Sequence, residues 1–545
     1  MTAPRPTSPA GSSPTSPSSP ASPSSPATPA SPGSASRTVT RDLLPAQVGA
    51  LLADGHRLAL VAGHDDGPTG FRVVYAFAHP GTDHRTELTV AMPRDDAWVP
   101  SLSTASFAAG RFERAIRDGF GIEPRGHVRP RRLMRHAHWP TGWYPMRRDA
   151  AADPVFGPDE SGFAFVPVEG QGVYEIPVGP VHAGMIEPGH FRFSVVGETI
   201  VRMKARLWFV HRGLEKHLQG RTPDEALPLT ERISGDTAVG HALTFAMAVE
   251  DALGVRVDEE DRLVRALLLE LERLHCHTTD LGAMANDVGL GILATHTLRL
   301  RESLLRSNAD VTGHRLLRGG IGIGGTRLRA LPDLDLIRSV AAEVAELVRI
   351  ALDTAVLVDR FTGTAVLHRE AAAEMGVLGY VARASGLDTD ARRDHPFVDL
   401  GPAFRVGTAY EGDVMARFRV RAEEVQVCTA LVADLVARLD GRLGTGRTWS
   451  GPASGDDAPR DRLEQPGDDP AGAPVTSGLA LVEAWRGTAC HRVELDAAGR
   501  LTRAAIVDPS FFTWPALPVA LADTIVPDFP LANKSFNQSY AGNDL

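Results

Sequence analysis

The spacing of hydrophobic residues changes once along this chain, and that change limits the folds it can adopt. Three short apolar runs between residues 56 and 93 are bounded by Gly, Asp or Pro, and they alternate with period two or run unbroken, as in β-strands. From about residue 200 onward, apolar residues recur with the spacing of a helix face, as in the set Leu263, Leu267, Leu271 and Leu274. The sequence therefore predicts an α+β protein: a small N-terminal α+β domain, then a mostly α-helical domain that opens with a short β-rich segment.

Two stretches lack the apolar residues that a folded core requires. Residues 1–37 are almost wholly Ser, Pro, Ala and Thr, and residues 441–478 are rich in Gly, Pro and Asp. Such compositions cannot bury enough apolar surface to offset chain entropy, so we expect a disordered tail and a disordered insertion. The rest of the chain divides into a small domain at 38–150, a linker at 151–175 and a large domain at 176–545.

Composition narrows the classes of function. The formal net charge of −10 argues against a nucleic-acid partner, because a phosphate binder needs a basic surface. No apolar run approaches the ~20 residues of a membrane-spanning helix. The cysteines, Cys276, Cys428 and Cys490, form no CxxC pair, which fits a reducing compartment. We therefore expect a cytoplasmic protein that can dock on a membrane complex.

Two motifs that suggest a ligand are better explained as structure. The glycines of a GxGxxG pattern, Gly320, Gly322 and Gly325, lack the preceding strand and following helix of a dinucleotide site. His275 and His277 are two positions apart, so on a helix they point about 200° away from each other and cannot share a metal ion. We expect a glycine-rich loop and a pair of structural histidines.

Polar residues gather at the start of one apolar helix, predicted at 238–253 and ended by Gly254. A helix start needs one Ser, Thr or Asp as its cap. The stretch ERISGDTAVGHALTF places Ser234, Asp236, Thr237 and His241 around the helix start instead. The excess favours a functional site over a simple cap.

A second polar segment precedes strand-like residues 191–210. The stretch VGPVHAGMIEPGHFRF holds His182 and His190 in a Gly- and Pro-rich turn, where a loop can present side chains to a cleft. Glu215 follows at the predicted start of a helix. Each residue alone is more often structural than catalytic, and their joint presence with the first cluster favours function.

Several segments, in this order, resemble the large subunit of group 4 membrane-bound [NiFe] hydrogenases and the related 49 kDa subunit of respiratory complex I. They include GPVHAGMIEPGHFR, HRGLEKHL, ERISGDTAVGHALTFAMAVE, ERLHCHTTDLGAMANDVG, EAWRG and VDPSFFTWPAL. The small domain resembles the complex I 30 kDa subunit through FERAIRDGFGIEPRGH and WPTGWYPMRRD. The resemblance implies a natural fusion of the two subunits.

The resemblance also marks a chemical difference. In the hydrogenases two CxxC pairs hold nickel and iron, whereas the matching positions here carry Ser234, Thr237, Ser510 and Thr513. A hydroxyl is a poor ligand for metals that seek thiolates. The resemblance therefore implies that the NiFe site has been lost, with no metal held by this chain.

In complex I, which the chain resembles, the emptied cavity is a quinone headgroup site. Its first turn histidine matches His182, its second falls near Ile186, and its tyrosine falls on Gly235. His190 is one candidate for the missing partner, and Asp236 with His241 is another. Histidine and carboxylate groups can donate the protons that carbonyl reduction requires. We expect catalytic roles for His182, Asp236, His241 and Glu215. His190 and the four hydroxyls of Ser234, Thr237, Ser510 and Thr513 are expected to line the quinone pocket, although those hydroxyls can equally be helix caps.

These features predict an oxidoreductase subunit similar to NADH-quinone oxidoreductase and hydrogenase subunits, peripheral on the inner face of the cell membrane. It would take electrons from an Fe–S cluster in a small partner subunit and reduce quinone, in NAD(P)H- or ferredoxin-linked respiration. Other expected partners are a ferredoxin-like Fe–S subunit and membrane antiporter-like subunits. Three cysteines are too few for a four-cysteine cluster, so no tightly bound cofactor is expected. The alternative is a metal-free, non-redox scaffold or coupling subunit of such an ion-translocating complex.

The C-terminal segment departs from the hydrogenases, in which the residues after the last cysteine are removed during metal insertion. A chain that inserts no metal has no need of this cleavage. We therefore expect the segment to stay in place and to pack across the former metal cavity, with polar contacts from Asn533, Asn537 and Tyr540.

Overall fold

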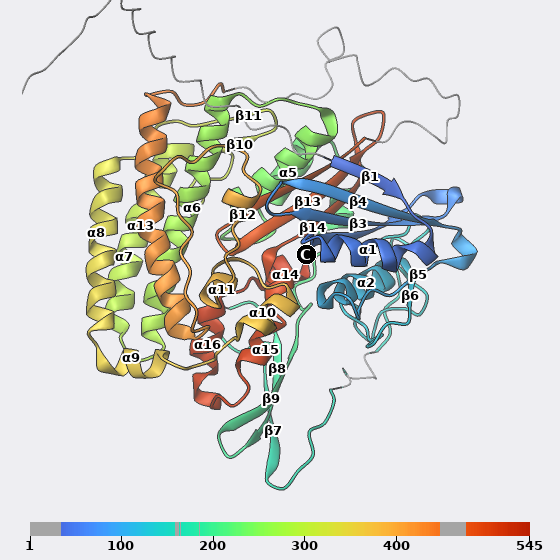
Figure 1. The fold of residues 1–545 in the computed structure, drawn as a ribbon, viewed down its shortest axis with the longest axis horizontal. Helices are drawn as coiled ribbons and strands as arrows, with labels where there is room; N and C mark the ends of the chain where they lie inside the picture. The colour runs from blue at the N-terminus through green and yellow to red at the C-terminus, as the bar shows by residue number, and fades with distance from the viewer. Residues whose placement is uncertain (1–33, 159–162, 164, 185, 447–475) are drawn as a thin grey trace, which may run out of the picture. The chain divides into compact units, whose positions relative to one another are not determined.

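The computed structural model describes residues 34–158, 163, 165–184, 186–446 and 476–545 (Figure 1). Its N-terminal part is a four-stranded sheet in the order β1-β4-β3-β2, in which β1 runs parallel to β4 and the other pairs are antiparallel. The strands predicted between residues 56 and 93 are confirmed. The elements are β1 (Ser34–Thr38), α1 (Leu44–Ala53), β2 (Arg57–Asp65), β3 (Phe71–His79), β4 (His84–Met92), β5 (Trp98–Pro100), α2 (Phe107–Phe120) and β6 (Glu123–Arg125).

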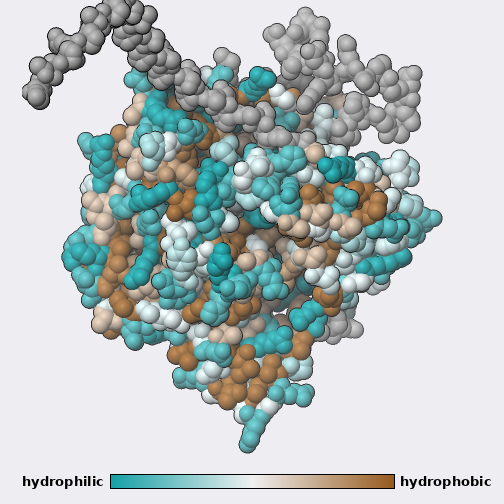
Figure 2. Space-filling model, viewed as in Figure 1, coloured by the Kyte–Doolittle hydropathy of each residue, from teal (hydrophilic) through white to brown (hydrophobic). Residues whose placement is uncertain are grey.

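The β-rich segment that opens the large domain is an antiparallel sheet in the order β7-β8-β9. Its strands are β7 (Val173–Val178), β8 (His190–Val196) and β9 (Thr199–Arg206). The loop at 179–189 joins β7 to β8 and carries the polar segment singled out from the sequence. Figure 2 shows apolar side chains grouped at the lower tip, where these strands lie in Figure 1, and Tyr174, Val196 and Val201 are 51%, 45% and 46% exposed.

A helical body follows, as the sequence predicts. Helices α6, α7, α8 and α13 run side by side (Figure 1), and the nearly all-apolar α5 is buried along most of its length. Gly254 ends α5 in the left-handed conformation, with φ 67°. The helices are α3 (Leu214–Leu218), α4 (Pro223–Thr230), α5 (Ala238–Leu253), α6 (Glu259–Asn286), α7 (Gly291–Thr312), α8 (Leu334–Leu352), α9 (Ala355–Phe361), α10 (Arg369–Met375), α11 (Gly379–Ala384), α12 (Ala391–Asp394) and α13 (Val414–Leu439).

A third sheet near the C-terminus was not predicted from the sequence. It has the antiparallel order β12-β13-β14 and is followed by four short helices. Every residue of β13 is buried, so the strand shows none of the polar and apolar alternation that reveals a half-exposed strand. The elements are β12 (Thr476–Ala484), β13 (Gly487–Leu495), β14 (Leu501–Val507), α14 (Pro509–Thr513), α15 (Ala516–Ala520), α16 (Phe529–Phe536) and α17 (Tyr540–Asp544).

This third sheet joins the two halves of the chain. Leu479 and Leu481 of β12 belong to the apolar core of the N-terminal domain, whereas α5 contacts both β12 and β13. Charged pairs cross the same boundary: Arg72 donates to Glu494 at 2.7 and 2.5 Å, and Arg492 donates to Glu87 at 2.8 and 3.0 Å. The core of the small domain is therefore completed by residues that lie near the other end of the chain.

Some domain boundaries differ from those predicted. Residues 34–37 were assigned to the tail but belong to β1, where hydrogen bonding to β4 outweighs a Ser-rich composition. Residues 173–175 of the linker lie in β7, and residues 476–478 of the insertion lie in β12. The remaining tail residues 1–33 and insertion residues 447–475 lie outside the described residues. Across the part of the chain that is described, no helix is both long and apolar enough to cross a bilayer.

Candidate functional site

The four hydroxyls at the former thiolate positions converge, and the C-terminal segment connects them. The Ser234 and Ser539 hydroxyl oxygens are 2.8 Å apart, and the Ser539 N–H donates to the Ser510 hydroxyl at 2.9 Å. Thr237 lies beside Ser234 at the start of α5, and Thr513 lies one turn from Ser510 in α14. All four are buried, at 2% exposure or less. Two polar segments far apart in sequence thus form one buried cluster.

Asp236 is held by Arg486 at the edge of this cluster. The two side chains form a double hydrogen bond, with N···O distances of 2.6 and 2.7 Å, and the Ser234 hydroxyl donates to the same carboxylate at 2.9 Å. Partial burial acts to raise the pKa of Asp236, but the charge and hydrogen bonds of Arg486 outweigh it and lower the pKa to about 2. At neutral pH Asp236 is therefore a fixed negative charge, and this geometry does not favour the proton-donating role predicted for it.

Arg486 lies within the segment EAWRG, and the sequence predicted no role for it. Its partner lies 250 positions earlier, and pairing at that separation leaves no local pattern. The one sequence feature that pointed to Arg486 was its place in EAWRG, a segment that resembles the hydrogenase large subunit. Arg486 also donates to the backbone oxygen of Asn537 at 2.6 Å, which ties the C-terminal segment to the cluster.

His241 pairs with Asp508, and not with Asp236 as the sequence suggested. The His241 Nε2 atom donates to Asp508 at 2.9 Å, and its Nδ1 lies 3.1 Å from Nε2 of His491, with the three side chains buried. Burial raises the pKa of the Asp508 carboxyl, but the hydrogen bond and charge of His241 bring it below its ordinary value. Burial and the neighbouring His241 lower the pKa of His491, which stays neutral.

His182 lies close to a tyrosine supplied by the C-terminal segment. Its Nε2 atom is 3.2 Å from the hydroxyl of Tyr540, the first residue of α17. The same loop is bound to α17 by a second contact, in which the Ala541 N–H donates to Glu187 at 2.9 Å. Burial lowers the pKa of His182 and raises that of Tyr540. The pair presents two neutral groups that can hydrogen-bond a carbonyl oxygen.

Two predicted site residues are not part of this cluster. His190 lies at the base of the 179–189 loop, where its Nδ1 is 3.1 Å from the oxygen of Gly179. Glu215 accepts from Arg503 at 2.8 Å and from the Ile506 N–H at 2.9 Å, so it joins α3 to β14. The structure therefore favours positioning roles for both residues.

The C-terminal segment packs across the former metal positions, as expected from the sequence. Asn537 donates to Asp280 at 2.7 Å, Asn533 hydrogen-bonds the Tyr540 side chain, and Trp514 donates to the backbone oxygen of Ser539 at 3.0 Å. The segment fits tightly, since a Cβ atom added to Gly542 would lie 2.5 Å from the Asp508 carboxyl. Asn533, Asn537 and Tyr540 all make the predicted polar contacts.

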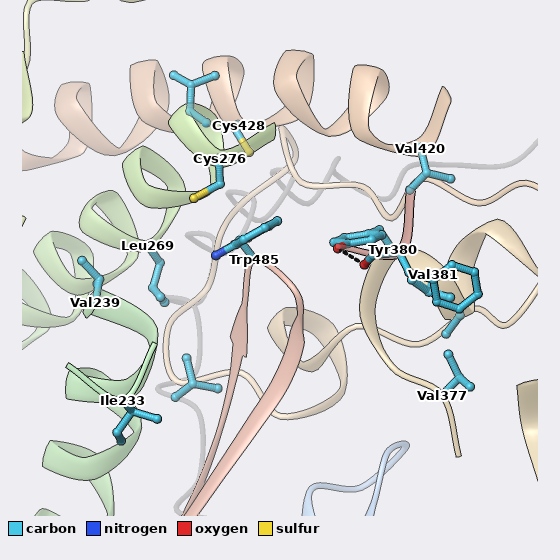
Figure 3. Close-up of a cluster of buried hydrophobic side chains, with 14 of the residues drawn as sticks. Ile233, Val239, Leu269, Cys276, Val377, Tyr380, Val381, Val420, Cys428 and Trp485 are labelled. Carbon is cyan, nitrogen blue, oxygen red and sulfur yellow. Dashed lines mark hydrogen bonds between the residues drawn. The ribbon is translucent and has the colours of Figure 1, made fainter. Parts of the chain in front are cut away.

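Aromatic residues lie behind the cluster (Figure 3). Trp485 stacks on Tyr380 with ring centroids 6.1 Å apart, and its N–H donates to the backbone oxygen of Asp236 at 2.9 Å. Cys276 donates to the same oxygen at 3.4 Å, and burial raises the pKa of its thiol. The thiol is therefore protonated and a poor metal ligand.

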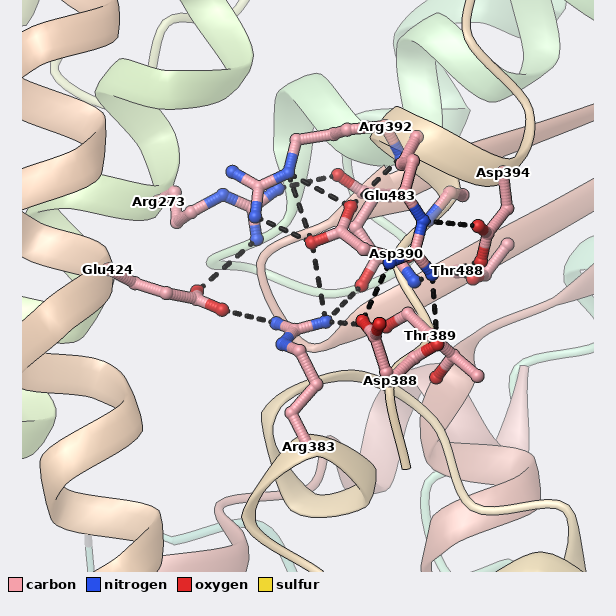
Figure 4. A network of polar contacts seen from close by, with 12 residues as sticks. Arg273, Arg383, Asp388, Thr389, Asp390, Arg392, Asp394, Glu424, Glu483 and Thr488 are labelled. Carbon is pink, nitrogen blue, oxygen red and sulfur yellow. Dashed lines mark hydrogen bonds and ion pairs between the residues drawn. The ribbon is translucent and has the colours of Figure 1, made fainter. Parts of the chain in front are cut away.

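A buried charge network joins α6, α11, α13 and β12 beyond the aromatic residues (Figure 4). Glu424 of α13 accepts from His277 at 2.6 Å and also from Arg383, which donates to Glu483 at 3.0 Å. His277 is thus a paired interior histidine, as predicted. Loss of one partner of a buried pair leaves an uncompensated charge. The network therefore favours the packing of these helices and β12 in which every charge keeps its partner.

The residues at the former metal positions do not fit a NiFe centre. The Ser234 and Thr237 hydroxyls donate to Asp236, and Ser539 of the C-terminal segment bonds the Ser234 and Ser510 hydroxyls. The Thr513 hydroxyl accepts from the Leu378 N–H, and hydroxyls bind soft metals poorly. Within the described ranges, no group of three or more His, Cys, Asp or Glu residues could hold a metal ion. The GxGxxG glycines form the short hairpin β10 (Ile321–Gly322) and β11 (Gly325–Thr326).

Three protein families match successive parts of the chain. Residues 38–154 match the family described as respiratory-chain NADH dehydrogenase, 30 Kd subunit, and residues 287–544 match its 49 Kd subunit. Residues 212–281 match the family described as nickel-dependent hydrogenase. The matched regions therefore follow the domain order expected from the sequence.

Curated relatives match over most of the chain. Formate hydrogenlyase subunit 5 of Escherichia coli is 30% identical, with 93% of this chain and 88% of the relative covered. Hydrogenase-4 component G of the same organism is 31% identical, with 93% and 87% covered. The C/D polypeptide of the NADH-quinone oxidoreductase of Phocaeicola vulgatus is 28% identical, with 70% and 78% covered.

A solved structure shows the same fold. It is that of the membrane-bound sulfane sulfur reductase (MBS), an archaeal respiratory membrane complex. The match has a TM-score of 0.58 at 24% identity and covers 70% of this chain and 100% of the other.

Proposed function

This chain belongs to the family of fused 30 kDa and 49 kDa subunits that includes hydrogenase large subunits and the C/D polypeptides of NADH-quinone oxidoreductase, and on this basis we propose that it reduces quinone. The relatives are subunits of membrane-bound hydrogenase and complex I-like complexes. Electrons would come from an Fe–S cluster in a partner subunit, within NAD(P)H- or ferredoxin-linked respiration.

One observation carries the proposal: the positions of all four thiolates hold hydroxyls, while a histidine and a tyrosine lie together beside them. The loss of thiolates argues against hydrogen chemistry at a NiFe centre. The 3.2 Å contact between His182 and Tyr540 supports a site that binds a carbonyl oxygen. The sequence analysis named His190, or Asp236 with His241, as the second group of the quinone site beside His182. We assign that role to Tyr540 of the C-terminal segment instead.

The proposed chemistry uses these side chains as proton donors. Quinone reduction takes two electrons and two protons; the electrons would come from the partner's Fe–S cluster. His182 and Tyr540 would donate hydrogen bonds to one quinone oxygen as negative charge develops there, and one of the two would pass its proton to that oxygen. Solvent would restore this proton and would supply the second proton to the other quinone oxygen. Tyr540 would have to move off His182 to admit the headgroup. The Asp236–Arg486 pair would form a fixed polar wall of the quinone pocket.

Surface features support membrane-complex partners. Exposed apolar side chains lie at the β8–β9 hairpin end of the β7–β9 sheet (Figure 2), and Val181, on the loop that carries His182, is 81% exposed. Clustered exposed apolar residues mark interaction sites. We propose that this surface is covered by an Fe–S small subunit or by a membrane-embedded partner. We also propose that the complex lies on the inner face of the membrane and contains ferredoxin-like and antiporter-like subunits.

A second candidate function is a non-redox scaffold or coupling subunit. The observation that favours it is the C-terminal segment itself, since Ser539 lies between Ser234 and Ser510 and so fills part of the space that a substrate would need. On this interpretation the chain transmits force between soluble and membrane subunits without turnover.

Binding of a short-chain ubiquinone analogue to the assembled complex separates the two functions. If the chain reduces quinone, His182→Ala and Tyr540→Phe lower the affinity by roughly tenfold, the cost of a lost hydrogen bond to substrate. The exposed His217 of α3 provides a matched control, His217→Ala, which leaves affinity unchanged. Failure of both site variants to alter binding, or no binding to the wild-type complex, would favour the scaffold.

A further inference from the structure

A cavity of about 240 Å³ lies at the boundary between the N-terminal domain and the large domain, and neither proposed function uses it. Its walls come from α2, residues 127–133, the end of β9 with the residues that follow, and residues 514–518. Exposed Phe107 and Val128 form its rim, at 42% and 60% exposure. The cavity is therefore reached from outside and closed by both domains.

Two buried guanidinium groups lie near the same tryptophan ring in this cavity. Arg111 and Arg206 are 7% and 5% exposed, and each guanidinium carbon lies 5.8 Å from the centroid of the same Trp208 ring. Arg114 and Arg129 also line the walls. Among the described residues that line the cavity there is no Asp or Glu. Four arginines therefore belong to the described lining, in a chain whose net charge is −10.

The hydrogen bonds that these two arginines donate go to neutral acceptors. Arg111 donates to the Phe511 backbone oxygen and to Asn543, and Arg206 donates to the backbone oxygens of Leu133 and Arg135. Each guanidinium has more N–H groups than these bonds use. Donors therefore remain for an additional acceptor.

The environment makes the two charges costly to bury. Burial, followed by the charge of Arg114, lowers the pKa of Arg111 to about 9, and burial followed by the charge of Arg132 lowers the pKa of Arg206 to about 10. The Asp118 and Asp544 carboxyls attract these charges from a distance, but they accept backbone N–H bonds from Leu133 and Val210 instead. A buried cation without a close counter-charge needs compensation.

The walls also provide aromatic and apolar surface. Trp208, Trp514 and Phe163 line the cavity, and the Arg206 guanidinium lies 4.8 Å from the Phe163 ring centroid. Leu133 and Trp208 also line a second cavity of about 120 Å³, whose other walls include Phe112 and Phe511. A ligand that binds the arginines would therefore meet apolar surface on its other side.

We propose that this cavity binds a compact organic anion, whose carboxylate or phosphate group lies between Arg111 and Arg206 and whose flat apolar part packs against Trp208. Guanidinium groups bind both kinds of oxyanion through paired N–H donors. A volume of about 240 Å³ is below the usual range of ligand pockets, which begins at about 300 Å³. The ligand is therefore about the size of a single ring with one anionic group.

Calorimetric titration of the full-length protein with benzoate, phenyl phosphate and inorganic phosphate tests this site. We expect one aromatic probe to bind more tightly than inorganic phosphate, and the tighter of the two identifies the anionic group as carboxylate or phosphate. Arg206→Gln is expected to lower that affinity at least about tenfold, since it removes a charge-assisted hydrogen bond. Arg129→Gln, at an exposed position on the cavity wall, lowers it by a smaller factor.

Arg338→Gln is the matched control, because Arg338 is exposed on α8 and pairs only with Asp335 in the described structure. It leaves binding unchanged. If Arg206→Gln fails to fold, Arg129→Gln still reports on the site without disturbing the core. The proposal is overturned if none of the probes binds, or if both cavity variants, Arg206→Gln and Arg129→Gln, bind as the wild type does. Equal affinity for inorganic phosphate would overturn the apolar part of the assignment.

Discussion

The hydroxyl of Ser539 lies 2.8 Å from the hydroxyl of Ser234, across 305 positions of sequence. Through this contact and its N–H bond to Ser510, the C-terminal segment occupies the space between Ser234 and Ser510. Ser539 also caps α17 by accepting from the Gly542 N–H at 2.9 Å. The tail is thus a structural part of the site.

Ser539→Ala is expected to lower the free energy of unfolding by about 1–2 kcal/mol, because it removes a helix cap and a buried hydrogen bond. Chemical denaturation of the purified protein measures this change. Ser303→Ala serves as a control, since its hydroxyl bonds only within its own exposed helix turn. An equal effect of the two substitutions would contradict the structural role of Ser539.

Stability at acid pH should depend on Asp236. Its pKa is about 2 in the folded chain against an ordinary 3.8, so its contribution is complete above about pH 4 and is lost as the pH falls toward 2. The side chain is 41% exposed, so solvent screening reduces the effect to about 1 kcal/mol. Denaturation curves between about pH 2 and 5 should show a steeper loss for the wild type than for Asp236→Asn. Parallel curves would refute the assignment.

Stability near neutral pH should depend on Glu272. This buried carboxyl accepts from the Val239 and Gly240 N–H groups at 2.7 and 3.0 Å, and burial raises its pKa to about 8 from 4.5. The folded chain therefore holds a proton that the unfolded chain releases between these values, so stability falls as the pH rises from about 4.5 to 8. In urea denaturation at about pH 5 to 8, Glu272→Gln should flatten this decline. A decline as steep as that of the wild type would show that Glu272 is not its source.

The purified complex should contain far less than one nickel per copy of this chain. Hydroxyls at 234, 237, 510 and 513 offer nickel no thiolate, and the buried Cys276 thiol stays protonated. Elemental analysis by mass spectrometry gives the ratio directly. One nickel per chain would refute the interpretation of the site.

The mature protein should retain the residues beyond Thr513. Ala532, Phe536 and Tyr540 are buried at 5% exposure or less, and the segment supplies Ser539 to the hydroxyl cluster. Intact-mass measurement should therefore give a chain that extends through α17. A mature end just past Thr513 would contradict this, and deletion of the segment should reduce the soluble yield sharply.

Most residues of the candidate site could be predicted from the sequence, but most of their partners could not. The four hydroxyl positions came from resemblance to cysteine-bearing relatives, and their convergence agrees with the structure. The partner of Asp236 was missed because Arg486 lies 250 positions away, and the partner of His241 was missed because Asp508 lies 267 positions away. Hydrogen bonds at such separations depend on chain topology and leave no mark on local residue patterns.

The sequence by itself determined the helical body and the small sheet, because hydrophobic period, capping residues and turn glycines such as Gly254 act over a few positions. The resemblance to cysteine-bearing relatives also implied the loss of thiolate chemistry, because the matching positions carry Ser or Thr. Only the tertiary structure decided that a buried sheet joins the two domains and that Tyr540 meets His182 across 358 positions. Such contacts arise when the packed core brings distant segments together, and short-range sequence patterns carry no information about them.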